Sequence, residues 1–152
     1  MRSRFLTSIL VSTAVAALSL GTSACSSSSS AGTPSGGTTT YGATLDGAHE
    51  APPVTTTATG MATFTLSADK MTLTYHITQN VAGASAAHIH TGVLGQAGPV
   101  AYPISPVSAD MSGTITLAHA TDVSNLDASM FYVNVHSTAN PNGEIRGQIS
   151  KQ

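Results

Sequence analysis

Apolar and polar side chains alternate along much of the chain between residues 59 and 150. In residues 59–66, Ala62, Phe64 and Leu66 share one side of the alternation, and in residues 70–78 four apolar side chains alternate with threonine and histidine. Successive side chains of a β-strand point to opposite faces, so each segment predicts a strand with one buried face. The same alternation predicts further strands at 112–117, 131–136 and 143–150.

Turn-forming residues separate these segments at short intervals. Ser67, Ala68 and Asp69 join two predicted strands, and a run of turn formers ending in Asn142-Gly143 joins the last two. The one helix that the pattern allows is short and spans 121–129, with Thr121 or Asp122 as its cap. Together, the alternating segments and the turns between them predict an all-β, antiparallel, Greek-key-like β-sandwich or barrel of about seven to eight strands.

The chain begins with a segment of a different kind. Residues 1–24 resemble a signal peptide, because a basic start is followed by an apolar run and then by small residues. Residues 25–40 are rich in serine, glycine and threonine and predict a disordered tether. Residues 41–152 then have a normal size for a single domain.

Cys25 is the only cysteine, and it directly follows the predicted signal peptide. This position is typical of a bacterial lipoprotein, although Thr22 stands where such signals normally carry leucine. We expect lipidation of Cys25 to anchor the protein to a membrane of the cell envelope, so that the domain is extracytoplasmic. The alternative is secretion without a lipid.

The composition excludes several classes of function. Lysine and arginine number five in total, so there is no basic stripe for nucleic acid, and we expect no nucleic-acid partner. No G-x-S-x-G pattern and no phosphate-binding glycine loop is present, and because the chain has only two glutamates we expect no hydrolase with paired carboxylates.

Histidines are the most prominent group of potentially functional side chains in the domain. His88 and His90 alternate around Ile89 and therefore predict two imidazoles on one face of a strand. If Val133 and Val135 face the core, His136 points outward, and so does Arg146 on the next strand. Three imidazoles and a guanidinium would then share the outer surface of the sheet. That arrangement predicts a metal site, provided that the imidazole nitrogens approach within about 4 Å of one another.

Each of these residues also has an architectural interpretation. In this interpretation His88 and His90 are surface histidines that bind the backbone of the 91–98 loop, and His136 closes the turn after its strand. Arg146 and Glu144 would form a cross-strand ion pair or anchor backbone. His49 is a tentative fourth ligand, whereas His76 and His119 are expected to be solvated.

Six short motifs follow one another along the domain. They are LDGAHEAPP (45–53), Gly60, AHIH (87–90), GPV (98–100), YVNVH (132–136) and GEIRGQI (143–149). In this order they resemble the CHRD domains, which are named after the repeats of chordin and occur in secreted bacterial proteins. The resemblance covers nearly all of residues 41–152 and implies a fold more firmly than a biochemical role.

The order His-x-His, Val-His and Gly-x-x-Arg-Gly is also similar, more distantly, to copper/zinc superoxide dismutases. That resemblance implies a superoxide dismutase-like barrel, with His88, His90 and His136 as copper ligands and Arg146 as a guide for the superoxide anion. Cu(II) favours imidazole nitrogen. No histidine lies between His90 and His119 to bridge two metals, so we expect no zinc-bridged site and at most a single copper.

Three functions follow from these observations. The first is a membrane-tethered module that binds a metal, for which copper is the expected ion, for storage, buffering or protection. The second is a structural or protein-binding β-sandwich without metal, whose partner the sequence does not identify. The third is a copper-only enzyme similar to superoxide dismutases. We expect binding rather than catalysis, and the sequence leaves the three open.

Overall fold

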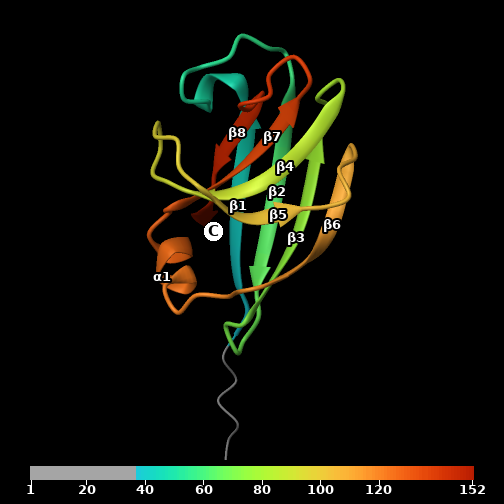
Figure 1. The fold of residues 1–152 in the computed structure, drawn as a ribbon. Coiled ribbons are helices and arrows are strands. Elements are labelled where there is room, and N and C mark those ends of the chain that lie inside the picture. The colour runs from blue at the N-terminus through green and yellow to red at the C-terminus, as the bar shows by residue number, and fades with distance from the viewer. Residues whose placement is uncertain (1–36) are drawn as a thin grey trace, which may run out of the picture. The chain divides into compact units, whose positions relative to one another are not determined.

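The computed structural model describes residues 37–152, and this part of the chain is built almost wholly from β-strands (Figure 1). The strands are β1 (Thr39–Asp46), β2 (Thr59–Leu66), β3 (Thr72–Gln79), β4 (Ala84–Thr91), β5 (Val100–Ile104), β6 (Asp110–Thr116), β7 (Phe131–Ser137), β8 (Ile145–Gln148) and β9 (Ser150–Lys151). A 3-10 turn, η1 (Gly47–His49), follows β1, and a short helix, α1 (Asp122–Asp127), precedes β7.

All strand pairs are antiparallel, and the sheet has the order β5-β4-β7-β8-β1-β2-β3-β6, with β9 beside β1. The two end strands, β5 and β6, approach one another, so the sheet curls into a nearly closed barrel (Figure 1). Neighbours such as β3 and β6, or β4 and β7, are not consecutive in the chain. The predicted all-β, antiparallel, Greek-key-like fold is therefore confirmed.

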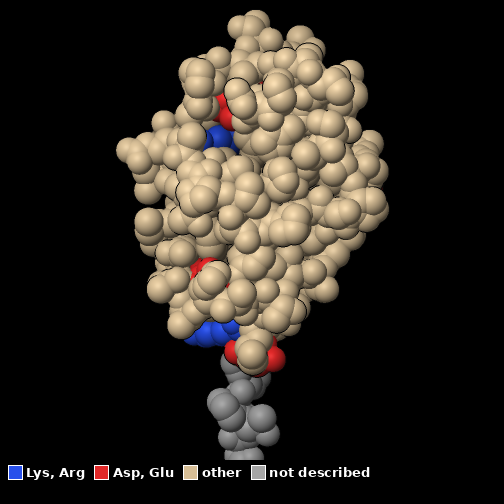
Figure 2. Space-filling view, viewed as in Figure 1, with Lys and Arg blue, Asp and Glu red and all other residues tan. Residues whose placement is uncertain are grey.

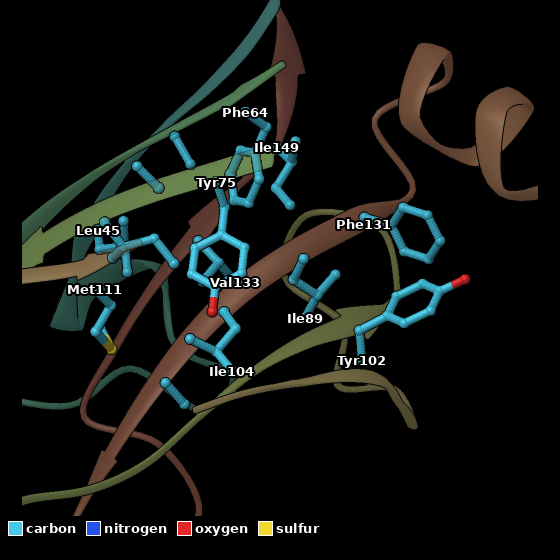
Figure 3. Close-up of a cluster of buried hydrophobic side chains, with 14 of the residues drawn as sticks. Leu45, Phe64, Tyr75, Ile89, Tyr102, Ile104, Met111, Phe131, Val133 and Ile149 are labelled. Atoms are coloured by element: carbon cyan, nitrogen blue, oxygen red, sulfur yellow. The ribbon is translucent and has the colours of Figure 1, made fainter. Parts of the chain in front are cut away.

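The interior of the barrel is filled by the apolar side of the alternation. Strands from around the sheet contribute side chains that meet at its centre, including Leu45, Phe64, Tyr75, Ile89 and Val133 (Figure 3). Each is at most 5% exposed, and removing such side chains from water is the main stabilising contribution to a fold of this kind. The described residues hold no disulfide, because Cys25 is the only cysteine.

The structure corrects several element boundaries. β3 begins at Thr72 rather than at residue 70, and the strand predicted over 143–150 divides into β8 and β9. The division falls at Ile149, whose N–H donates to the carbonyl of Phe131, after which the chain pairs with β1 instead. β1 also includes Thr39 and Thr40, which the composition places in the tether.

The predicted helix over 121–129 is present but shorter. α1 spans Asp122–Asp127, and Thr121 at its start makes no capping hydrogen bond through its side chain. Asp122 instead accepts hydrogen bonds from the backbone N–H of His119 and the hydroxyl of Tyr102, which joins the helix to β5. In residues 37–152 no helix is long and apolar enough to cross a membrane. The predicted signal peptide, Cys25 and most of the tether lie outside the described residues.

Candidate metal centre

Three neighbouring strands bring the predicted site residues onto one face of the sheet. β4 pairs with β7 and β7 pairs with β8, in registers that place His88, Asn134 and Arg146 in one row across the strands. His90 and Tyr132 lie in the next row, and His136 follows Asn134 by two positions along β7. The expectation that three imidazoles and Arg146 share a face opposite the core is confirmed.

This face is not the solvent-exposed surface that the alternation predicts. Every residue of β7 is buried, including those pointing away from the barrel interior. Loops cover the face: Asn134 donates to Glu50 in the segment after η1, and His136 contacts the carbonyl of Pro141. Arg146 contacts the loop between β4 and β5. The site therefore lies in a second buried layer, between the sheet and its loops.

Two of the three histidines are oriented by backbone carbonyl oxygens. Nδ1 of His90 lies 3.0 Å from the oxygen of Gly98, and Nδ1 of His136 lies 3.0 Å from the oxygen of Pro141. A carbonyl oxygen only accepts hydrogen bonds, so both Nδ1 atoms carry a proton and the lone pair of each neutral ring is on Nε2. Metal-binding histidines are commonly oriented in this way by a second hydrogen bond.

The remaining nitrogens converge. His88 Nδ1 is 3.0 Å from His136 Nε2, and one nitrogen from each of His88, His90 and His136 lies within 4.8 Å of the others. His90 Nε2 is buried and has no hydrogen-bond partner in the described part of the chain. A buried acceptor without a partner is costly, and this one belongs to one of the three imidazole rings that come together here.

The charge state of the three imidazoles suits metal binding. Burial lowers the pKa of all three rings below the ordinary value for histidine. The neutral form, which is the form that binds a metal, is therefore favoured at neutral pH. The proton between His88 Nδ1 and His136 Nε2 has to leave or move to the other His88 nitrogen before an ion can bind both atoms.

A shared metal at about 2 Å from each nitrogen requires that the nitrogens be no more than roughly 4 Å apart. The three imidazole nitrogens lie within 4.8 Å of one another, which is slightly more than the separation that a shared metal requires. Only His88 lacks a backbone carbonyl contact on its ring, and it is half-buried. His88 is therefore the ring of the three that the covering loops hold least.

Arg146 is placed differently from an anion guide. It is 1% exposed, and its terminal nitrogens donate to the carbonyl oxygens of Gln96 and Val93 at 2.8 and 2.9 Å. Its guanidinium carbon lies 3.4 Å from the centre of the Tyr132 ring. These contacts correspond to the backbone-anchoring interpretation. The ion pair with Glu144 is absent from the described residues, and Glu144 accepts a hydrogen bond from Thr56 instead.

The other histidines lie apart from the group. His49 is exposed at the end of η1, where its Nδ1 is 2.7 Å from a carboxylate oxygen of Asp46, and it is not among the residues that converge. His76 is an exposed partner of Asp110 on β3. His119 is exposed in the segment before α1.

Three residues of the buried layer were not predicted as site residues, although the alternation places two of them, Tyr132 and Asn134, on the outward face beside His136. The Tyr132 ring stacks on His90 with centroids 4.9 Å apart and planes 8° from parallel. Asn134 donates to Glu50 Oε1 at 2.8 Å, and burial raises the pKa of Glu50 to about 7 against the opposing effect of the Arg146 charge. For Tyr132 and Asn134 the available signal was the alternation in YVNVH, which places both on the face of His136; no pattern in the sequence indicates that Glu50 joins them.

Residues 41–149 match the CHRD domain family. The chain belongs to this family. No curated protein and no solved structure matches it, so the similarity to copper/zinc superoxide dismutases stays a sequence-based prediction. The CHRD match extends from β1 to Ile149, and the histidine group therefore lies wholly within the family domain.

Proposed function

We propose that this CHRD domain binds one copper ion through His88, His90 and His136, and that it stores or buffers copper outside the cytoplasm. The observation that carries the proposal is the convergence of three imidazole rings, one of which, His90, has a buried Nε2 without a hydrogen-bond partner in the described residues. An architectural role accounts for the carbonyl contacts of His90 and His136 with their loops. It gives no reason for the third histidine or for the unpartnered nitrogen.

Copper is the ion that the donor set favours. The group consists of imidazoles alone, without the carboxylates that suit magnesium, calcium or manganese. Copper(II) has the highest affinity for nitrogen donors among the divalent ions of the first transition row. Zinc is the competing ion, since it also binds imidazole.

The extracytoplasmic location rests on the leader pattern of residues 1–24 and on Cys25. A lipid on Cys25 would hold the domain at a membrane, where the domain would meet incoming copper before it reaches the cell interior. Globomycin treatment, which blocks processing of lipoprotein precursors, tests this part separately. An unprocessed precursor is expected, and unchanged processing would contradict lipidation.

Copper titration of the purified full chain tests the metal site. A Cys25→Ser background removes the one thiol, which would otherwise bind copper itself. We expect one copper per chain, and an affinity loss on the order of 100-fold, or about 2.7 kcal/mol, in His88→Ala, His90→Ala and His136→Ala. His49→Ala is expected to bind as the parent does, because His49 lies outside the group.

His76→Ala and His119→Ala are matched controls, because each removes an exposed imidazole from the same domain. Both should bind copper with the parental affinity. Stoichiometric copper that survives all three site substitutions, or a loss equally large in the controls, would contradict the proposal. Preferential binding of zinc in direct competition would contradict the choice of copper.

A superoxide assay on the copper-loaded protein separates binding from the dismutase-like alternative. We expect no acceleration of superoxide dismutation beyond that of free copper at the same concentration. The reason is that Arg146 donates to loop carbonyls and is almost inaccessible to an incoming anion. Acceleration that depends on His88, His90 and His136 would show that the site is an enzyme.

A further inference from the structure

A buried positive charge lies in the same layer as the three histidines. Arg146 and His90 belong to strands on opposite sides of β7, and Tyr132 of β7 stands between them. The guanidinium carbon is 3.4 Å from the Tyr132 ring centre, and that ring is stacked on His90 at 4.9 Å. Arg146, Tyr132 and His90 thus form a three-layer stack that ends on a proposed copper ligand.

The charge of Arg146 is not neutralised by direct contact. In residues 37–152 no carboxylate forms an ion pair with it, and its hydrogen bonds go to the neutral oxygens of Gln96, Val93 and Gln148. Its Nε is buried without a partner. Water screens a charge so deeply buried only weakly, so the field of Arg146 extends into the histidine group.

The nearest compensating charge is that of Glu50, which interacts with Arg146 at longer range. Glu50 is itself buried and is held by a hydrogen bond from Asn134. The surroundings of the site on this face therefore contain one cation and one acidic group. The three imidazole ligands bring no negative charge to offset that of a bound ion.

We propose that Arg146 sets the charge preference of the histidine site and favours copper(I) over copper(II). The inference rests on the proposed copper-binding function. A monovalent ion meets half of the repulsion that a divalent ion meets from the same guanidinium, and neutral ligands do nothing to reduce the difference. For unit charges roughly 8 Å apart at an effective dielectric constant of about 20, the repulsion corresponds to about 30-fold in affinity.

Glu50 offsets part of this effect, so we expect Arg146 to change the ratio of copper(I) to copper(II) affinity on the order of tenfold. For a one-electron couple, tenfold corresponds to about 59 mV in the midpoint potential. Arg146 is then a selectivity residue that acts through space, across the Tyr132 ring, without contact with the metal.

The test is a measurement of both affinities for the full chain in the Cys25→Ser background. Copper(I) affinity is measured by anaerobic competition with a chromogenic chelator, and copper(II) affinity by competition with an amino acid chelator. Arg146→Met removes the charge but keeps a flexible apolar stem, and Arg146→Lys keeps the charge. We expect the affinity ratio to fall about tenfold in Arg146→Met and to stay within about threefold of the parent in Arg146→Lys.

Glu50→Gln gives a second measurement that does not disturb Arg146. It removes the acidic group at pH 8 while its amide oxygen can still accept from Asn134. The ratio should change in the opposite direction, toward copper(I), because the charge of Arg146 is then less compensated. This variant keeps the inference testable even if Arg146→Met does not fold.

The outcomes separate the two proposals. A parent that binds neither copper ion through the histidines refutes the proposed function. A parent that binds copper with the same affinity ratio in Arg146→Met and Glu50→Gln refutes the charge preference alone. Equal falls in Arg146→Met and Arg146→Lys would also refute it, because they would show that the shape of arginine and not its charge controls the ratio.

Discussion

The two sides of the barrel use the same alternating pattern with different results. On β3, Leu73, Tyr75 and Ile77 are buried in the core, whereas Thr74 and His76 on the other face are exposed. β7 alternates in the same way in sequence, yet all of its residues are buried. The difference lies in the loops, which cover the outer face of β4, β7 and β8 but leave that of β2, β3 and β6 open.

The two faces also differ in the functional groups that they carry. The open face carries mainly threonine and serine, and its one histidine is 52% exposed and paired with Asp110. The covered face carries His136, which is 8% exposed, together with Arg146, Asn134 and Tyr132. Burial lowers the pKa of the histidines and limits screening of the charge, so neutral ligands and a persistent field occur on the covered face.

Charge is otherwise scarce on this domain. Most of the surface visible in Figure 2 is neither acidic nor basic, which agrees with a charged fraction of 8% in the whole chain. Few other charged groups therefore alter the electrostatic potential that the buried guanidinium of Arg146 produces on the covered face.

The largest expected effect that tests this comparison is the loss of Arg146. Arg146→Ala should lower the free energy of unfolding by about 2–4 kcal/mol, because two loop carbonyls lose their donors and a cavity forms between sheet and loop. Urea unfolding followed by circular dichroism measures it. Lys151→Ala, which removes an exposed cation, should cost much less, and equal losses would show that the covering loop adds no stability.

The next effect compares one polar side chain from each face. Asn134→Ala should cost about 1–3 kcal/mol, since it removes the side-chain hydrogen-bond donor of the buried Glu50. Thr63→Ala on the open face of β2 should change stability by no more than about 0.5 kcal/mol. The same unfolding experiment measures both, and similar values for the two variants would remove the distinction between the faces.

A smaller effect depends on pH. Glu50 has a folded-state pKa of about 7 because of burial, above its value in the unfolded chain, so the folded state binds more protons between about pH 4.5 and 7. Stability from this group is present at low pH and is lost as the pH rises through 7. The parent should therefore lose stability between pH 5 and pH 8 that Glu50→Gln does not lose. The free energy of unfolding of Glu50→Gln minus that of the parent should increase by about 1–2 kcal/mol from pH 5 to pH 8.

Unfolding curves of parent and variant at the two pH values measure the gain, and the histidine contributions cancel in the difference. Glu144→Gln is the matched control. Hydrogen bonds, chiefly from Ser137, lower the pKa of Glu144, so its protonation falls below this pH window and its difference from the parent should stay constant. A constant difference for Glu50→Gln would contradict the burial of that carboxyl.

The smallest effect is on the open face. His76→Ala should change the free energy of unfolding by less than about 0.5 kcal/mol, because the pair with Asp110 is exposed to water and salt. Copper affinity should not change. Measurement at low and high salt gives the electrostatic part, and a loss as large as that of Asn134→Ala would show that both faces are equally important for stability.

The sequence by itself determined which residues share a face. Alternation with a period of two is a local property of a strand, so it located β2 at residues 59–66, placed His88 and His90 together, and set Val133 and Val135 toward the core. The order of the short motifs identified the CHRD family, which the comparison confirmed. These conclusions required no knowledge of which strands are neighbours.

Only the tertiary structure decided that the face is covered and which atoms meet within it. The pairing of β4 with β7 joins residues nearly fifty positions apart, and the carbonyls of Gln96 and Val93 turn Arg146 from an expected surface cation into a buried anchor. Such contacts depend on loop paths and on register between distant strands. Because local alternation distinguishes only the two sides of a strand, it cannot tell an outer face open to water from one that loops have buried.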